Sequence, residues 1–363
     1  MNEKNTATQL TVAEPVADRA TVERINRVAE AHGVEGISTR LSAFTHWLKD
    51  DLTQLDHLLG HVVVDPSVDV AWRAAEYLLD RPGKRMRPLC VMLASRMLGR
   101  ADTDAVLRAA AAAELVHAAT LLHDDVIDQG DERRGQPTAR LVFGNAASVL
   151  GGDHLLIEAL KRVDGLPDGI LASLLDVIAG MVSAEALQLE ARNRVTPDRT
   201  LYMRVVEGKT AALFRWALTS GARLGGLPVH DAERLGEVGH LLGVTFQLID
   251  DLLDLTGNPE ITGKGIALDL IEGKLTWPII LAAERSASVL GRLKAISAAK
   301  QVPSPDETNT LVALIEATGA IDETRTKASQ YAARAQGELE HLPQSPSRDA
   351  LSLVINKALE REF

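Results

Sequence analysis

The sequence has very few cysteines and aromatic residues. Cys90 is the only cysteine among 363 residues, so the chain can form no internal disulfide and no cysteine-based zinc site. Aromatic residues make up only 3% of the chain, and its 27 glycines and 14 prolines are too few for a collagen-like repeat or a turn-rich β sandwich. This cysteine usage is typical of a reducing compartment.

The chain also lacks an excess of basic residues and a long apolar run. Its 50 acidic residues outnumber its 39 lysines and arginines, which gives a formal net charge of −11. General nucleic-acid binding depends on basic surfaces that neutralise phosphates, so we expect no nucleic-acid partner. The first ten residues lack the apolar core of a signal peptide, and no uninterrupted apolar run approaches the ~20 residues of a membrane span. We therefore expect a cytoplasmic protein without an integral membrane segment.

What the sequence does have is helical periodicity. Leu48, Leu52, Leu55 and Leu59 recur at steps of three and four, which is one face of a helix. Prolines fall between the apolar segments, and no stretch shows the sustained alternation of a half-buried strand. The pattern predicts an all-α, single-domain helical bundle over 41–363, preceded by a polar and partly helical tail over 1–40. The expected helices are 41–60, 68–80, 85–98, 103–129, 145–163, 168–193, 198–221, 230–256, 276–288, 306–318, 321–340 and 347–360.

Two segments, 124–128 and 250–254, carry the same acidic pattern, DDxxD, inside an apolar helical sequence. Positions i and i+4 share a helix face, so the first and last aspartates of each motif lie side by side and repel each other unless a cation joins them. Oxygen-only ligands suit Mg²⁺, which completes its shell with water and substrate phosphates. The motifs therefore predict a magnesium site. Its candidate ligands are Asp124, Asp125, Asp128, Asp250, Asp251 and Asp254.

A single DDxxD motif is explained about equally well by a solvated acidic turn and by a metal site. The chain offers a comparison, because Asp50, Asp51 and Asp56 are also clustered but do not share a helix face. We interpret that cluster as surface. Two copies of DDxxD in apolar helices are much harder to obtain by chance, which favours the metal site.

Basic residues gather near both acidic motifs. The segment GKRMRP at 83–88 places three cations at the predicted start of a helix, and two arginines follow the first acidic motif. Taken singly, each of these cations is best interpreted as a solvent-exposed surface residue. Arginine guanidinium groups and helix N-termini, however, are natural diphosphate binders. Together they predict two diphosphate sites, one bound through metal and one bound directly by cations. The basic residues are Lys84, Arg85, Arg87, Arg133, Arg134, Lys209, Lys264 and Lys274.

Further segments extend this pattern over roughly 45–340. They are LLHDDVID at 121–128, RRGQPT at 133–138, GNAASVLGGDHLL at 144–156, Gln188, KTAALF at 209–214, FQLIDDLLD at 246–254, GK at 263–264 and ALDLIEGKLTWP at 267–278. With them, the chain resembles the all-trans polyprenyl diphosphate synthases, which have the class I isoprenoid synthase fold. It departs from the family at Ala184, where glycine is common, and at Trp277, where leucine or tyrosine is common, and neither departure changes a charge.

The resemblance implies a role for each matching residue and a homodimeric assembly. The implied metal ligands are Asp124 and Asp128 for two Mg²⁺ and Asp250 for a third, with Asp125, Asp251 and Asp254 as weaker or water-mediated ligands. The implied contacts of the allylic diphosphate are Arg133, Lys209, Gln247 and Lys264, with Thr210 and Lys274 nearby. The implied contacts of isopentenyl diphosphate are Lys84, Arg87, His117 and Arg134. The residues expected to be catalytic are Asp124, Asp128, Asp250, Lys209 and Arg133.

The implied reaction begins when metal and cations stabilise the departing diphosphate, so that the allylic C–O bond ionises. The double bond of isopentenyl diphosphate then attacks the allylic cation, and a proton is lost to the released diphosphate. This chemistry needs no nucleophilic side chain, which agrees with the lack of a Ser/His or Cys/His arrangement in the sequence.

Three other functions fit the sequence less well. A terpene cyclase needs no second diphosphate site and usually has a different second metal motif. A regulatory subunit of a heteromeric synthase would be expected to lose carboxylates, and both motifs are intact here. A phosphohydrolase using His123 and Asp124 would need a metal-binding histidine pair upstream, and the sequence has none.

Residues one to three turns before Asp124 bear on product length. Family members that stop at fifteen carbons, or at twenty in one subtype, place a bulky aromatic at a position matching Ala119 or Thr120. The absence of such an aromatic residue predicts a medium-to-long product of ~C30–C40, with geranylgeranyl diphosphate (C20) as the alternative. A further alternative is that Leu156 or Leu160, on another helix, closes the tunnel and limits the product length. The expected tunnel residues are Ala119, Thr120, Val116 and Ala112.

Overall fold

The computed structural model describes residues 48–60, 69–81, 83–99, 103–133, 135–167, 169–192, 194–257, 268–299 and 304–360. The chain divides into two units, Met1–His57 and Leu58–Phe363. The tail expected over 1–40 lies outside the described residues. Helix α3 (Lys49–Gly60) crosses the boundary between the units.

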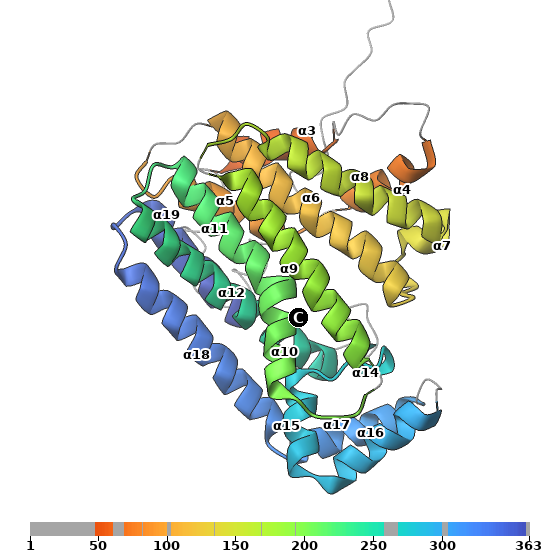
Figure 1. Cartoon of the computed structure of the whole chain (residues 1–363). Helices are drawn as coiled ribbons and strands as arrows, with labels where there is room; N and C mark the ends of the chain where they lie inside the picture. The colour runs from red at the N-terminus through yellow and green to blue at the C-terminus, as the bar shows by residue number, and fades with distance from the viewer. Residues whose placement is uncertain are drawn as a thin grey trace, which may run out of the picture. The chain divides into compact units, whose positions relative to one another are not determined.

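The described part of the Leu58–Phe363 unit is helical almost throughout, which confirms the predicted all-α class (Figure 1). Its only strands among the described residues form a two-stranded antiparallel ribbon, β1 (Glu132–Arg133) and β2 (Gln136–Pro137). The helices are α4 (Asp69–Leu79), α5 (Met86–Ser95), α6 (Thr103–Ile127), α7 (Ala139–Phe143), α8 (Asn145–Val163), α9 (Ile170–Ala191), α10 (Arg199–Val206), the π-helical turn η1 (Glu207–Ala211), α11 (Ala212–Leu224), α12 (Val229–Thr256), α14 (Leu268–Ile271), α15 (Trp277–Arg285), α16 (Ala287–Ala299), α17 (Pro305–Ala317), α18 (Ala320–Glu340) and α19 (Pro346–Leu359).

Three helical features differ from the sequence-based expectation. The helix expected over 198–221 is interrupted by η1, which separates α10 from α11. The short helices α7 and α14 and the longer helix α16 were not expected. Only Val289 and Leu293 are buried in α16, so this helix has too narrow an apolar face to produce a clear periodic signal.

Close contacts at glycines bring the helices that carry the acidic motifs against their neighbours. Helix α6 packs along α8, and α12 packs along α11 and α18. A β-carbon at Gly239 would lie 2.4 Å from the carbonyl oxygen of Phe214, and one at Gly243 would lie 2.5 Å from the α-carbon of Ala211. The absence of these β-carbons therefore lets α12 approach α11 and η1 directly. This approach places η1 beside the acidic end of α12.

Asp251 joins three helices beneath that end. Its side chain is buried and accepts hydrogen bonds from the hydroxyl of Tyr202 (2.5 Å), the side-chain amide of Gln247 (2.9 Å) and the backbone N–H of Trp277 (3.1 Å). Burial raises the pKa of Asp251 to about 7, with a smaller contribution from the charge of Asp269, while the three donors oppose the rise. The carboxylate thereby ties α12 to α10 and α15.

The raised pKa of Asp251 predicts a dependence of stability on pH. Because the folded state holds this proton more tightly than the unfolded state does, the contribution is fully present below the ordinary pKa of 3.8 and is lost as the pH rises through about 7. Asn does not titrate, so we expect the melting temperature of the wild type to fall relative to Asp251→Asn between about pH 5 and about pH 8. Thermal melting followed by circular dichroism, in the presence of a chelator, measures both melting temperatures. The same difference between wild type and Asp251→Asn at about pH 5 and about pH 8 would contradict the prediction.

Candidate active site

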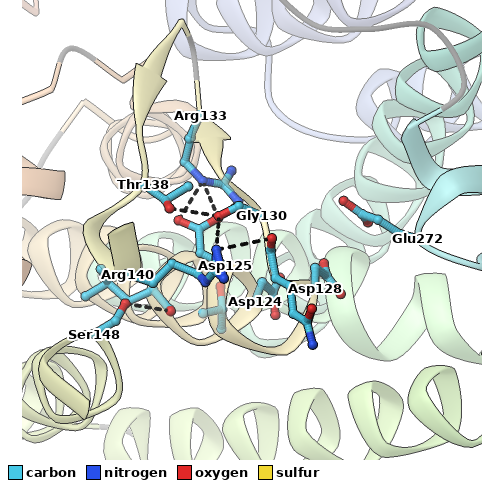
Figure 2. A network of polar contacts seen from close by, with 12 residues as sticks. Asp124, Asp125, Asp128, Gly130, Arg133, Thr138, Arg140, Ser148 and Glu272 are labelled. Atoms are coloured by element: carbon cyan, nitrogen blue, oxygen red, sulfur yellow. Dashed lines mark hydrogen bonds and ion pairs between the residues drawn. The ribbon is translucent and has the colours of Figure 1, made fainter. Parts of the chain in front are cut away.

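The first acidic motif lies at the C-terminal end of α6, where Asp124 and Asp128 are one helical turn apart (Figure 2). The second motif lies in the last turns of α12, which ends at Thr256. The C-terminal end of a helix carries partial negative charge, which disfavours a nearby carboxylate by about 0.3–1 kcal/mol at an exposed position. Repulsion between carboxylates adds to this, so both helix ends require positive charge.

Burial divides the aspartates of each motif in the same way. The first and last aspartates of both motifs are partly exposed, whereas Asp125 is 3% exposed and Asp251 is 1% exposed. Asp125 instead accepts hydrogen bonds from the guanidinium of Arg133, at 2.7 and 3.0 Å. Both buried carboxylates are held by protein donors, and the expectation that Asp125 and Asp251 act as weaker or water-mediated metal ligands stays a prediction. The partly exposed aspartates are Asp124, Asp128, Asp250 and Asp254.

Three side-chain cations neutralise the first motif. The ammonium of Lys209 lies 3.2 Å from Asp124, and that of Lys274 lies 2.7 Å from Asp128. The guanidinium of Arg192 also pairs with Asp128 and donates to the carbonyl oxygen of Ile127 at 2.9 Å. The three cations come from three separate segments of the chain, and all of them meet at the end of α6.

The two carboxylates respond differently to these cations. Burial raises the pKa of Asp124, and Lys209 offsets only part of that rise. Burial acts in the same direction on Asp128, but Lys274, Lys209 and Arg192 together hold the pKa of Asp128 below its ordinary value. Asp124 is thus the carboxylate with the greater electrostatic need for a further positive charge.

Lys209 extends from the π-helical turn η1, a feature that is often found at functional sites. Its ammonium also pairs with Glu185 and donates to the side-chain oxygen of Gln188 at 3.1 Å. The next residue, Thr210, donates through its hydroxyl to the side-chain oxygen of Gln247 at 3.0 Å. Because Gln247 donates in turn to Asp251, this network orients Gln247, which was expected to contact the allylic diphosphate, and Thr210, which was expected nearby.

The second motif connects to the same site through the segment that follows it. Asp254 accepts a hydrogen bond from the backbone N–H of Asp269 at 3.3 Å. Lys274 pairs with Glu272 at 2.7 Å as well as with Asp128, so this segment reaches across to the end of α6. Figure 2 shows Glu272 on an element separate from the one that carries Asp124 and Asp128.

A second group of basic residues lines a cavity beside α6. Its lining includes Gly83, Arg85, Glu114, His117 and Arg133. Arg133 was expected with the allylic diphosphate, but the structure places it at Asp125 and on the wall that also contains His117. Two expected residues of the basic groups, Arg134 and Lys264, lie outside the described residues.

Lys84 and Arg87 lie on either side of the lining residue Arg85 in the chain, at the start of α5. Lys84 is exposed, whereas Arg87 is buried with its guanidinium 4.6 Å from the ring centre of Phe214. Burial lowers the pKa of Arg87, and the charges of Glu114 and Asp250 oppose this shift. The electrostatic coupling to Asp250 connects the basic group with the second acidic motif.

Only one of the four expected tunnel residues is partly exposed. Ala112, Val116 and Ala119 are fully buried, and helical spacing puts Ala112 and Ala119 on the face of α6 that packs against α8. Thr120 is partly exposed, and its hydroxyl donates to the carbonyl oxygen of His117 at 2.8 Å. Thr120 is therefore the residue of this set that borders open space.

The sequence analysis gave no role to the charged residues Arg192, Glu272 and Glu185, which pair with Asp128, Lys274 and Lys209. Arg192 follows an apolar helix and belongs to no recognisable motif, so nothing in a single sequence marks it. Glu272 lies two residues before Lys274, and its role depends on the tertiary fold that brings this segment to α6.

The donors at the end of α6 and along α12 are all carboxylate oxygens, the ligand type that Mg²⁺ prefers. Among the described residues, no three acidic, histidine or cysteine side chains converge on one point, because lysines lie between the carboxylates. A bound Mg²⁺ would therefore complete its shell with water or with substrate phosphates, which is its usual behaviour. The donor set fits this ion.

Comparison with known proteins identifies the family of this site. The polyprenyl synthetase family matches residues 69–315. The all-trans-nonaprenyl-diphosphate synthase (geranyl-diphosphate specific) of Rhodobacter capsulatus is 33% identical over 314 residues, 86% of this chain and 95% of that protein. The geranylgeranyl diphosphate synthase of Methanosarcina mazei is 32% identical over 327 residues, 87% of this chain and 97% of that protein.

A solved structure agrees with these relatives. The crystal structure of a polyprenyl synthase from Caulobacter crescentus CB15, complexed with calcium and isoprenyl diphosphate, aligns with a TM-score of 0.82 at 33% identity and covers 88% of this chain and 97% of its own. The fold, the arrangement of the paired acidic motifs and these matches lead to one assignment. This chain belongs to the polyprenyl synthetase family and is a trans-prenyltransferase.

Proposed function

We propose that this enzyme uses Mg²⁺ to condense isopentenyl diphosphate with an allylic diphosphate, and that its product is a medium-to-long all-trans polyprenyl diphosphate. The observation that carries this proposal is the meeting of partly exposed carboxylates with Lys209 and Lys274, beside a separate cavity lined by basic residues. The family match over residues 69–315 supports a catalytic domain in this part of the chain, and we propose that this domain spans 41–363 with 1–40 as a tail.

The acidic end of the site would hold the metal and the allylic diphosphate. Asp124 and Asp128 would hold two Mg²⁺ and Asp250 a third, and bound Mg²⁺ would supply positive charge that favours departure of the diphosphate. The Caulobacter crescentus structure is complexed with calcium and isoprenyl diphosphate, which supports a divalent cation and a diphosphate as ligands here. Lys209 and Lys274 would donate to diphosphate oxygens, since both already lie among the carboxylates.

The basic cavity would hold isopentenyl diphosphate. Lys84, Arg87 and His117 would bind its diphosphate directly, which needs no metal because arginine and lysine donate charge-assisted hydrogen bonds. Its double bond then attacks the allylic cation, and the proton released goes to the departed diphosphate. The aliphatic core around α6 would keep water away from the cation, which prevents its hydrolysis.

We expect Asp124→Ala and Asp250→Ala each to reduce product formation about a thousandfold or more with little loss of stability. Removal of one carboxylate relieves repulsion at a helix end, whereas the charge on the departing diphosphate loses its metal. Product formation is measured by mass spectrometry and stability by thermal melting. Asp104→Ala, at an exposed position in the first turn of α6, is the matched control and should keep wild-type activity. Near-normal activity of either active-site variant would overturn the metal assignment.

We also propose that the enzyme is a cytoplasmic homodimer. Two helices, α6 and α9, are long and apolar enough to cross a membrane by length and composition. In α6, 78% of the apolar window is buried inside the protein, whereas in α9 only 22% is buried. Large apolar side chains remain exposed along α9 and on the neighbouring helix α8. They are Leu150, Ile157, Leu175, Val182 and Leu189. A second copy of the chain would cover this surface, and burial of each such side chain contributes roughly 1.5–3 kcal/mol.

We expect light scattering at micromolar concentration to give the mass of a dimer, and Val182→Lys to shift the protein toward monomer. A lysine here would bury a charge without a partner in the interface. Val229→Lys is the matched control, because Val182 is 65% exposed on α9 and Val229 is 64% exposed on α12. A monomeric wild type, or an equal effect of both variants, would contradict the proposed interface.

Product length gives a further prediction at Thr120. Growth stops when the next isoprene unit would have to overpack the end of the tunnel, which costs about 1–3 kcal/mol or more. We expect a wild-type product of ~C30–C40, and Thr120→Phe should shorten it toward C15 or C20 because Thr120 borders open space. Ala119→Phe should also shorten the product, but with a loss of thermal stability, since Ala119 is fully buried. Unchanged products from both variants, measured by mass spectrometry, would locate the wall on another helix.

A further inference from the structure

The segment between Lys84 and Arg87 has an unusual backbone conformation. Arg85, which precedes α5, has φ 45° and ψ 35°, in the left-handed region. In the described part of the chain, only Arg85 and Gln129 among non-glycine residues have a positive φ. Such a conformation is unfavourable for a residue with a β-carbon and persists only where the surroundings hold it.

The side chain of Arg85 supplies that restraint. One guanidinium nitrogen donates to the carboxylate of Glu114 on α6 at 2.7 Å, and another donates to the carbonyl oxygen of Leu79 at the end of α4 at 3.2 Å. The ion pair is shielded, with the side chains of Arg85 and Glu114 17% and 8% exposed. Arg85 is thus fastened to two helices, while its backbone begins a third.

Glu114 also acts on the other side of this turn. Among the charges that oppose the effect of burial on the pKa of Arg87, that of Glu114 is the largest. The buried Nε of Arg87 has no hydrogen-bond partner among the described residues. Glu114 lies three residues before His117 on the same helix, so a single helix carries the anchor of the turn and one wall of the cavity.

We propose that Glu114 is a positioning residue for the isopentenyl diphosphate site. By holding Arg85 in its left-handed conformation, Glu114 orients the turn that presents Lys84 and Arg87 to the cavity beside His117. Glu114 also lines this cavity, but its carboxylate is engaged by Arg85, so we assign it a positioning role and not a direct contact with substrate. This inference rests on the proposed function, because it assumes that the cavity receives a diphosphate.

The first test compares Glu114→Gln with the wild type, and Glu76→Gln, at an exposed position on α4, is the isosteric control. We expect Glu114→Gln to raise the KM for isopentenyl diphosphate about tenfold or more, with less than about a twofold change in the KM for the allylic diphosphate. A purely structural role for Glu114 would instead lower kcat and stability without this separation, and that result would overturn the proposal. Glu76→Gln should match the wild type.

The second test uses glycine to separate the backbone from the side chain. Glycine adopts the left-handed region without strain, so Arg85→Gly should raise the KM for isopentenyl diphosphate less than Arg85→Ala does. Glu114→Gln added to Arg85→Gly should have a smaller effect than Glu114→Gln has in the wild type, because the contact with Arg85 has been removed and only the charge interaction with Arg87 is left. Equal effects of Arg85→Gly and Arg85→Ala, or additive effects in the double variant, would overturn the proposal even if Glu114→Gln alone folds poorly.

The wild-type enzyme separates the two hypotheses. If it forms no product from isopentenyl diphosphate, the proposed function fails. If it is active and the variants leave the KM for isopentenyl diphosphate unchanged, the proposed function stands and the positioning role fails.

Discussion

Repulsion among carboxylates at the C-terminal ends of α6 and α12 is the constraint on which the site depends. At the end of α6, Asp124 and Asp128 face each other and the negative end of the helix dipole. These carboxylates pair with Lys209, Lys274 and Arg192, which come from three different segments of the chain. A site that already needs three side-chain cations is suited to a reaction in which metal ions and a charged diphosphate meet.

Contacts between the surrounding helices position those cations. The close approach of α12 to η1 at Gly243 brings the turn that carries Lys209 beside the acidic end of α12. The buried carboxylate of Asp251 fastens the same region, because it holds Tyr202, Gln247 and the backbone of Trp277. At the other end of the site, the pair between Arg85 and Glu114 has the corresponding role for the basic turn. Buried ion pairs and hydrogen bonds thus hold both the acidic helix ends and the basic turn in place.

Helical spacing predicted only those features of the site that depend on a single helix. The rule that i and i+4 share a face agrees with the partly exposed first and last aspartates of each motif. The same rule places Asp125 and Asp251 off that face, but their partners, Arg133 and Tyr202, come from elsewhere in the chain. Such partners depend on tertiary packing, which spacing does not describe.

Other features escaped the sequence for related reasons. Arg192 belongs to no motif, and the π-helical turn η1 has no periodic signal that distinguishes it from the α-helices on either side. The tunnel lining expected along α6 stays a prediction, since Ala112 and Ala119 are fully buried and Thr120 is partly exposed. Small residues permit both close packing and open space, so only the position of the neighbouring helix distinguishes the two.

The central claim is that two diphosphates react in one site that depends on Mg²⁺. The most direct measurement is the initial rate of diphosphate release by the wild-type enzyme with an allylic diphosphate alone, with isopentenyl diphosphate alone, and with both, each with Mg²⁺ and with a chelator. The account predicts rapid release only when both substrates and Mg²⁺ are present. Equally rapid release from the allylic diphosphate alone would contradict it and indicate cyclisation or hydrolysis.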